Sequence, residues 1–235
     1  SDGTPNRNWQ NNMGNGGGGP NGMGRPDDNG NGTGGEPPAM PTADNTDTTD
    51  STSTSAKALK AGSEVNISGG EFKIDSADDS VHSNGNIVIT GGNISAASGD
   101  NGMHANGNLT ISDGTVNITK SYEGIEGSIV TIDGGNVSVV ASDDGINCAG
   151  GSDTGSTDRM GADQFSAQEG VELNINGGTV TINAEGDGLD SNGNFTMTGG
   201  TVYVCGPTNG GNGALDYNGT ATVTGGTLIA CGAVG

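Results

Sequence analysis

The sequence predicts an all-β fold, a right-handed parallel β-helix (solenoid) of about seven coils with ~22 residues in each. Three observations lead to this prediction. Turn pairs that contain glycine recur at nearly constant intervals, two apolar residues at alternate positions flank each pair on both sides, and a third apolar position follows in every repeat. Each repeat therefore supplies three short inward-facing strands joined by tight turns, which form one coil.

The turn pairs set the period of the repeat. They are Gly69-Gly70, Gly91-Gly92, Asp113-Gly114, Gly134-Gly135, Gly177-Gly178, Gly199-Gly200 and Gly225-Gly226. Their separations are 22, 22, 21, 43, 22 and 26 residues, and the separation of 43 is one ordinary repeat plus an inserted loop at 148–170. Acidic side chains in this loop could add ligands, but a tolerated surface loop is the plainer interpretation. The loop contains Asp153, Asp158, Arg159 and Asp163.

The apolar positions predict strands rather than helices. Leu173, Ile175, Val180 and Ile182 alternate with polar residues around one turn pair, and a period of two indicates half-buried strands. Glycine interrupts this pattern every ten or so residues and β-branched residues dominate it, which excludes helices. A right-handed coil is expected because left-handed crossovers are rare. The third apolar positions are Val81, Met103, Ile125, Ile146, Leu189 and Leu215.

The N-terminal quarter of the chain has a different composition. Residues 1–41 are rich in Gly, Asn and Pro, and residues 42–63 are rich in Thr, Ser and Asp. Such compositions resist the packing of a core, so we expect a tail followed by a linker. The β-helix is expected over 64–235.

The charge of the chain limits its partners. Acidic residues number 28 against 7 basic ones, which gives a formal net charge of −21. This charge excludes binding to nucleic acid phosphates and disfavours an anionic membrane surface. No apolar run approaches the ~20 residues that a membrane span needs. Cations are the expected partners.

Two polar columns flank the third apolar position, because equivalent residues of successive coils become neighbours in space. The first column is Asp79, Asn101, Glu123, Asp144 and Asp187, and the second is His82, His104, Glu126, Asn147, Asp190 and Asp216. Carboxylates stacked ~4.8 Å apart repel one another by about 1 kcal/mol per pair even in water, so repeated stacking calls for a counter-ion.

Calcium fits such a column, because it takes oxygen ligands at about 2.3–2.6 Å and can bind carboxylates of adjacent coils. A weaker extension covers Asp78, Asp79, Asp100 and Asn101. The alternative, that acidic turn residues only keep the surface soluble, stays open. The predicted Ca²⁺ ligands are Glu123, Glu126, Asp143, Asp144, Asn147, Asp187, Asp190 and Asp216.

Histidine and cysteine add two weaker signals. His82 and His104 stack in the second column and could hold a transition metal, but an exposed ladder is the more ordinary interpretation. Cys205 and Cys231 lie at equivalent positions, and a disulfide between them is compatible with the coil spacing but not predicted.

The region 64–235 resembles secreted parallel β-helix proteins of clostridia and related bacteria that bind cellulose and acidic sugars. The segments that carry the resemblance are 118–127 (ITKSYEGIEG), 141–147 (ASDDGIN), 186–193 (GDGLDSNG) and 206–217 (GPTNGGNGALDY). The resemblance implies an extracellular or cell-surface protein, calcium in the coil turns, and affinity for polygalacturonate-like (pectin-like) plant polysaccharide or cellulose.

Three functions follow from these features. The first is calcium-dependent, non-catalytic binding of an acidic polysaccharide, which a chain of charge −21 would otherwise repel. The second is a structural subunit that associates head to tail into a filament or surface layer, because the last residues carry no amphipathic cap. The third and least favoured is a pectate lyase-like enzyme, for which Lys120 is the candidate base among few basic residues. We predict that the protein is not an enzyme.

Overall fold

The computed structural model describes residues 56–149 and 166–233, which belong to one compact unit, Ser51–Gly235. These residues form a 16-stranded parallel sheet and contain no helix. Paired residues lie one repeat apart in the sequence, as Val65 and Ile87 do, or Val180 and Val202. The predicted all-β parallel solenoid, with about seven turns and a ~22-residue spacing, is confirmed.

The strands are arranged in three stacks. The first stack contains the third apolar position of each repeat and is built mostly from three-residue strands. Its members are β1 (Leu59–Ala61), β3 (Val81–Ser83), the start of β5 (Met103–Lys120), the start of β6 (Ile125–Ile132), β8 (Ile146–Cys148), β11 (Leu189–Ser191) and β14 (Leu215–Tyr217).

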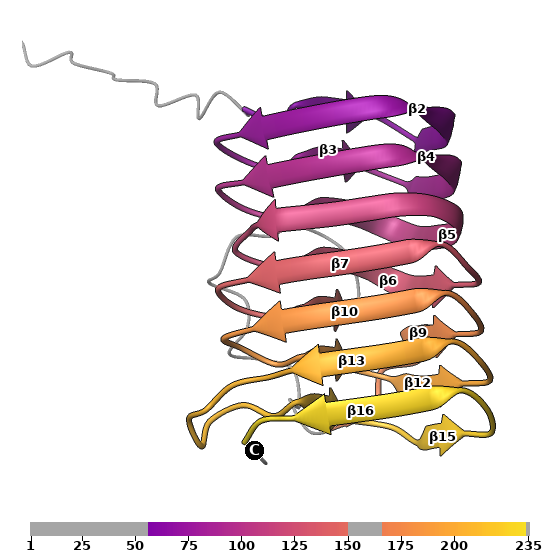
Figure 1. Cartoon of the computed structure of the whole chain (residues 1–235), viewed down its shortest axis with the longest axis vertical. Coiled ribbons are helices and arrows are strands. Elements are labelled where there is room, and N and C mark those ends of the chain that lie inside the picture. The colour runs from indigo at the N-terminus through magenta and orange to yellow at the C-terminus, as the bar shows by residue number, and fades with distance from the viewer. Residues whose placement is uncertain (1–55, 150–165, 234–235) are drawn as a thin grey trace, which may run out of the picture. The chain divides into compact units, whose positions relative to one another are not determined.

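The second and third stacks lie before and after the turn pairs. The second contains β2 (Glu64–Ser76), β4 (Asn86–Ser98), β5, β6, β9 (Glu172–Ile175), β12 (Asn194–Met197) and β15 (Ala221–Val223). The third contains the later parts of β2, β4 and β5, followed by β7 (Asn136–Ala141), β10 (Thr179–Ala184), β13 (Thr201–Cys205) and β16 (Thr227–Cys231). Figure 1 shows the third stack from β2 to β16.

The core is a set of inward-facing columns of aliphatic side chains. One column runs through paired positions of the second stack and holds Ile87, Leu109, Val130, Leu173 and Phe195, all buried. The predicted third apolar positions are also buried, except that Leu215 is half-buried. A narrow core of this kind suits a chain with only 29% hydrophobic residues.

The second residue of each predicted turn pair needs glycine. All seven of these glycines have φ between 76° and 98°, a region that other residues rarely adopt. At Gly92 a side chain would also approach the backbone of the preceding coil, since its Cβ would lie 3.1 Å from the Gly70 carbonyl oxygen. Positive φ and close stacking together explain why the turns repeat so strictly.

The first coil reaches into the segment assigned to the linker. Strand β1 pairs with β3, with Leu59 beside Val81, so coil structure begins before residue 64. The predicted tail over 1–41, the rest of the linker up to residue 55, and Asp153, Asp158, Arg159 and Asp163 of the inserted loop lie outside the described residues. Within the described ranges, no helix of the length and apolarity needed to cross a membrane occurs.

Candidate functional site

Both predicted polar columns are present beside the first stack. In the second column, Glu126 pairs with His104 and Asn147, and Asp190 pairs with Asn147 and Asp216. In the first column, the backbone carbonyls accept hydrogen bonds from the preceding coil, for example Asp144 from Gly124 N and Asp187 from Gly145 N, each within 2.9 Å. The strand register therefore brings the acidic residues of successive coils together.

Glycines between the columns allow this close stacking. A Cβ on Gly124 would overlap the Val139 side chain and the Gly145 carbonyl oxygen, and a Cβ on Gly145 would overlap the Ile182 side chain and the backbone of Gly188. The backbone is thus packed tightly at the level of the carboxylates, which fixes the spacing of the two columns.

The C-terminal coils bring three carboxylates into one group, the carboxylate cluster, formed by Asp144, Asp187 and Asp190. Each residue offers an oxygen within 4.8 Å of the other two. Asp144 Oδ1 accepts a hydrogen bond of 2.7 Å from the backbone nitrogen of Asp187, and Asp187 Oδ1 accepts one from the backbone nitrogen of Gly213. Among the described residues, no basic side chain forms an ion pair with these three aspartates.

Burial and mutual repulsion raise the pKa values of the three aspartates in the carboxylate cluster. Burial, and then repulsion from Asp143, Asp187 and Glu123, raises the pKa of Asp144 to about 7. Burial and four neighbouring carboxylates raise the pKa of Asp190 to about 8. The pKa of Asp187 is raised as well, by burial and by Asp216 and Asp143. At neutral pH the cluster therefore holds protons that a cation could replace.

Asn147 lies between the two ends of the second column. Its side chain is 5% exposed, and Nδ2 donates a hydrogen bond of 3.3 Å to Glu123 Oε1. The buried Oδ1 atom has no hydrogen-bond partner among the described residues. A buried acceptor without a donor costs about 1–3 kcal/mol, and amide oxygens are good ligands for hard cations. This atom could therefore serve as a ligand to a hard cation.

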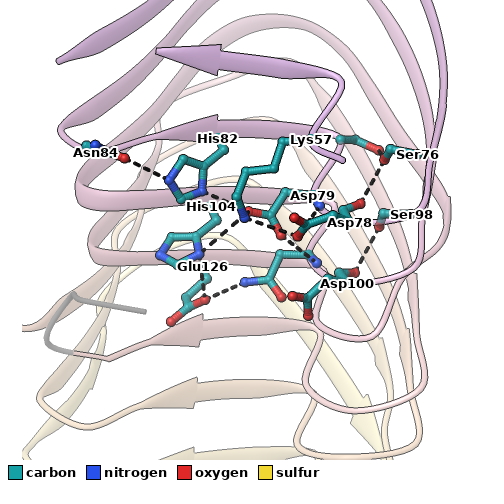
Figure 2. Close-up of polar contacts among 12 residues, drawn as sticks. Lys57, Ser76, Asp78, Asp79, His82, Asn84, Ser98, Asp100, His104 and Glu126 are labelled. Carbon is teal, nitrogen blue, oxygen red and sulfur yellow. Dashed lines mark hydrogen bonds and ion pairs between the residues drawn. The ribbon is translucent and has the colours of Figure 1, made fainter. Parts of the chain in front are cut away.

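The N-terminal coils hold a different group, the histidine cluster. It is formed by Asp79, His82 and His104, whose ligand atoms lie within 4.8 Å of one another, and by Glu126, which contacts His104 (Figure 2). His82 Nδ1 lies 2.8 Å and His104 Nδ1 4.0 Å from Asp79 Oδ2, and His104 Nδ1 lies 3.4 Å from Glu126 Oε2. The histidines stack as predicted, with ring centroids 4.9 Å apart. The expectation of an exposed ladder is wrong, because His82 and His104 are only 4% and 3% exposed.

Lys57 supplies a positive charge to this end of the column. Its Nζ atom lies 2.5 Å from Asp79 Oδ2 and 3.1 Å from Asp78 Oδ1, and its side chain is 8% exposed. Burial lowers the pKa of Lys57, but hydrogen bonds to Asp79 and Asp78 outweigh this effect and raise the pKa above its ordinary value. The side chain is therefore charged. Asp78 and Asp79 thus have a basic partner within the protein.

The structure brings most of the predicted calcium ligands together, but not all of them. Asp144, Asp187 and Asp190 form the carboxylate cluster, and Glu123, Asp143 and Asp216 act on its pKa values. Asn147 is tied to Glu123. Glu126 instead belongs to the histidine cluster, where its Oε2 also accepts a hydrogen bond from Asn101.

Lys57 is the site residue that the sequence analysis missed. It stands 22 residues before Asp79, as Leu59 stands 22 before Val81, so it occupies the first polar column of the first coil. Extending the repeat one period toward the N-terminus would have found it. The Ser/Thr-rich composition of the preceding residues concealed this repeat.

Comparison with known proteins gives one match. A family model described as carbohydrate-binding domain-containing protein matches residues 29–102 and 103–213, well over half of the chain. No curated protein and no solved structure matches the chain. The second matched range contains the whole carboxylate cluster.

Proposed function

The chain belongs to the family of carbohydrate-binding domain-containing proteins, and from this premise we propose that it binds an acidic, pectin-like polysaccharide through calcium held by the carboxylate cluster. The binding is non-catalytic. We further propose an extracellular or cell-surface location, where calcium concentrations suit sites with a Kd of about 10⁻⁴–10⁻³ M.

The observation that carries the proposal is the convergence of Asp144, Asp187 and Asp190 without a basic partner among the described residues. Two oxygens on opposite sides of one calcium ion lie about 4.8 Å apart, and no separation between the three aspartates' ligand atoms exceeds this value. A divalent cation would offset the repulsion that raises these pKa values. All the donors are oxygens, and adjustable carboxylate geometry favours calcium over the smaller, octahedral magnesium ion.

The polysaccharide would complete the coordination of the ion. Asp144, Asp187 and Asp190 are only partly buried and Asp216 is exposed, so the cluster is open to solvent on one side. Sugar carboxylates can occupy ligand positions that the protein leaves to water. Calcium would then join two polyanions, the sugar chain and a protein of charge −21, that repel each other without it.

A non-catalytic role agrees with the placement of the basic residues. Lys120, the candidate base for a lyase, is exposed on β5, and Lys73 is exposed on β2. Lys57, the buried lysine, is engaged by Asp78 and Asp79. Arg159 lies outside the described residues.

Binding of polygalacturonate in calcium and in excess chelator tests the proposal. We expect retention on the polysaccharide with calcium, loss with chelator, and about ten-fold weaker binding for the double variant Asp187→Asn/Asp190→Asn. Asp75→Asn on β2 removes a carboxylate charge away from the cluster and should bind normally. Equal binding with calcium and with chelator would contradict the proposal.

A second candidate ligand is a neutral polysaccharide such as cellulose. It is favoured by exposed apolar side chains on the outer face of the third stack, where Tyr203 of β13 lies beside Ile229 of β16. Aromatic side chains on a flat surface can contact sugar rings. Cellulose binding that survives chelation and is lost in Tyr203→Ala would identify this face as a separate binding surface.

A further inference from the structure

The histidine cluster holds three donor atoms within 4.8 Å of one another and a fourth beside one of them (Figure 2). They are Asp79 Oδ2, His82 Nδ1, His104 Nδ1 and Glu126 Oε2, with separations of 2.8, 3.4 and 4.0 Å for the pairs that are in contact. In a tetrahedral zinc site with ligands at 2.0–2.1 Å, two ligand atoms lie roughly 3.4 Å apart. The three separations bracket this value, so Asp79, His82 and His104 can supply three ligands, and movement of the Glu126 carboxylate toward them would supply the fourth.

The donor types distinguish this group from the carboxylate cluster. Two imidazole nitrogens and two carboxylate oxygens suit zinc and other first-row transition metals, whereas calcium takes oxygen ligands alone. Asp79 is 1% exposed and the two histidines are nearly as deeply buried. Such burial is typical of a closed metal site rather than of a surface charge ladder.

The hydrogen bond between His82 and Asn84 also favours a metal site. His82 Nε2 lies 3.0 Å from Asn84 Oδ1, and an amide oxygen accepts hydrogen bonds, so Nε2 carries the proton. In the neutral ring Nδ1 then directs a lone pair at Asp79 Oδ2, 2.8 Å away. Two acceptors at this distance require a proton or a metal ion between them. Outer-shell partners fix metal-binding histidines in this way.

Lys57 would compete with a metal ion for Asp79 Oδ2. Its ammonium group shares Asp79 Oδ2 with His82 and also contacts Asp78. A metal ion on Asp79 would displace the ammonium from that oxygen, and the lysine could keep its contact with Asp78. Metal and lysine are therefore alternative counter-ions for Asp79.

We propose that Asp79, His82, His104 and Glu126 form a transition-metal site, selective for ions such as Zn²⁺ over Ca²⁺, in which the incoming ion replaces the Lys57 ammonium on Asp79. One pair of polar columns would then hold two kinds of metal, a nitrogen-ligated ion in the N-terminal coils and calcium in the C-terminal coils.

The test is a Zn²⁺ titration of the chelator-treated full chain in millimolar calcium, followed by competition with a colorimetric zinc chelator. We expect one equivalent of zinc in the wild type and loss of that equivalent in His82→Gln/His104→Gln. Lys57→Met should bind zinc several-fold more tightly, because it removes the competing cation. Asp190→Asn is the matched control, since it alters the carboxylate cluster and should leave zinc binding unchanged.

Cobalt adds a spectroscopic check. Co²⁺ bound to the wild type should give the visible absorption of a tetrahedral nitrogen and oxygen site, and Glu126→Gln should alter that spectrum even if the double histidine variant does not fold. Failure of the wild type to bind zinc overturns the proposal. So does zinc binding that is unchanged in folded His82→Gln/His104→Gln, or weaker zinc binding in Lys57→Met.

Discussion

The two ends of the polar columns meet the same electrostatic problem in different ways. In the N-terminal coils Asp78 and Asp79 share the Lys57 ammonium as a counter-ion, and His82 lies 2.8 Å from Asp79. In the C-terminal coils the charged neighbours of Asp144 and Asp190 among the described residues are other carboxylates, and the pKa values of these two aspartates rise to about 7 and about 8. The coil geometry is shared, so the residue type at each repeat position decides whether the counter-ion comes from the protein or from solution.

The largest loss of stability is expected when a glycine between the two polar columns is replaced by a larger residue. Gly145→Ala would place a methyl group against Ile182 and Gly188, and overpacking of this kind costs about 3 kcal/mol or more, because backbone cannot give way. Gly69→Ala is the control, because nothing lies within 4 Å of a Cβ there. Urea unfolding of both variants measures the difference. Equal stabilities would show that the columns are not held at a fixed spacing.

Substitution of Lys57 tests whether this lysine stabilises the buried aspartate in the N-terminal coils. Without added metal, Lys57→Met leaves the buried Asp79 carboxylate without its lysine partner, although it keeps His82 and the Asn101 backbone nitrogen, and should lower the free energy of unfolding by about 2–3 kcal/mol. Lys60→Met, an exposed change three residues further along the chain in β1, should be close to neutral. If Lys57→Met is as stable as Lys60→Met, the lysine does not stabilise this end, and the contrast between the two ends fails.

The pH dependence of stability tests the C-terminal end. Asp144 and Asp190 have folded-state pKa values of about 7 and about 8, above the ordinary value of 3.8. A raised pKa means that the fold favours the protonated carboxyl, so this stabilisation is full below pH ~4 and is lost as pH rises through 7–8. The melting temperature of chelator-treated protein should therefore fall between pH 5 and pH 8.

Calcium should prevent the fall in melting temperature between pH 5 and pH 8, because it stabilises the ionised carboxylates. In Asp144→Asn/Asp190→Asn the melting temperature should vary less with pH. Thermal unfolding is monitored by circular dichroism at several pH values, with and without calcium. It measures the pH dependence of the melting temperature for calcium-free wild type, calcium-bound wild type and the double variant. A flat profile for calcium-free wild type would show that the carboxylate cluster is not under repulsion.

The smallest effect concerns the rim of the carboxylate cluster. Asp216 is exposed and raises the pKa values of Asp187 and Asp190. Asp216→Asn should raise the melting temperature of the calcium-free protein by about 1–2 °C and weaken calcium binding a few-fold, because surface charges act weakly through solvent. Differential scanning calorimetry detects the first change. Changes of the same sign in both quantities would contradict a common electrostatic origin.

The repeat made the fold predictable from sequence. Glycine at the second turn position reports a positive φ that few other residues accept, so the turns could be placed to the residue, and strand register then followed from the period. The columns were predictable for the same reason, since a parallel solenoid turns equal sequence spacing into spatial contact.

Side-chain directions and burial were less predictable. Glu126 was grouped with the calcium ligands from its column, but its contacts are with His104 and Asn101 in the N-terminal coils. The histidines were expected at the surface because nothing in the repeat marks how deeply a turn is covered. Lys57 was overlooked because the coil begins inside a segment whose composition resembles a linker.

Calcium titration by isothermal calorimetry in two buffers of different ionisation enthalpy tests the central claim most directly. The wild type at pH 7 should bind calcium with release of protons from Asp144 and Asp190, so the observed heat should depend on the buffer. Asp187→Asn/Asp190→Asn should bind at least about ten-fold more weakly and release fewer protons. Absence of calcium binding, or binding with no proton release and equal affinity in the double variant, would contradict a calcium site in the carboxylate cluster.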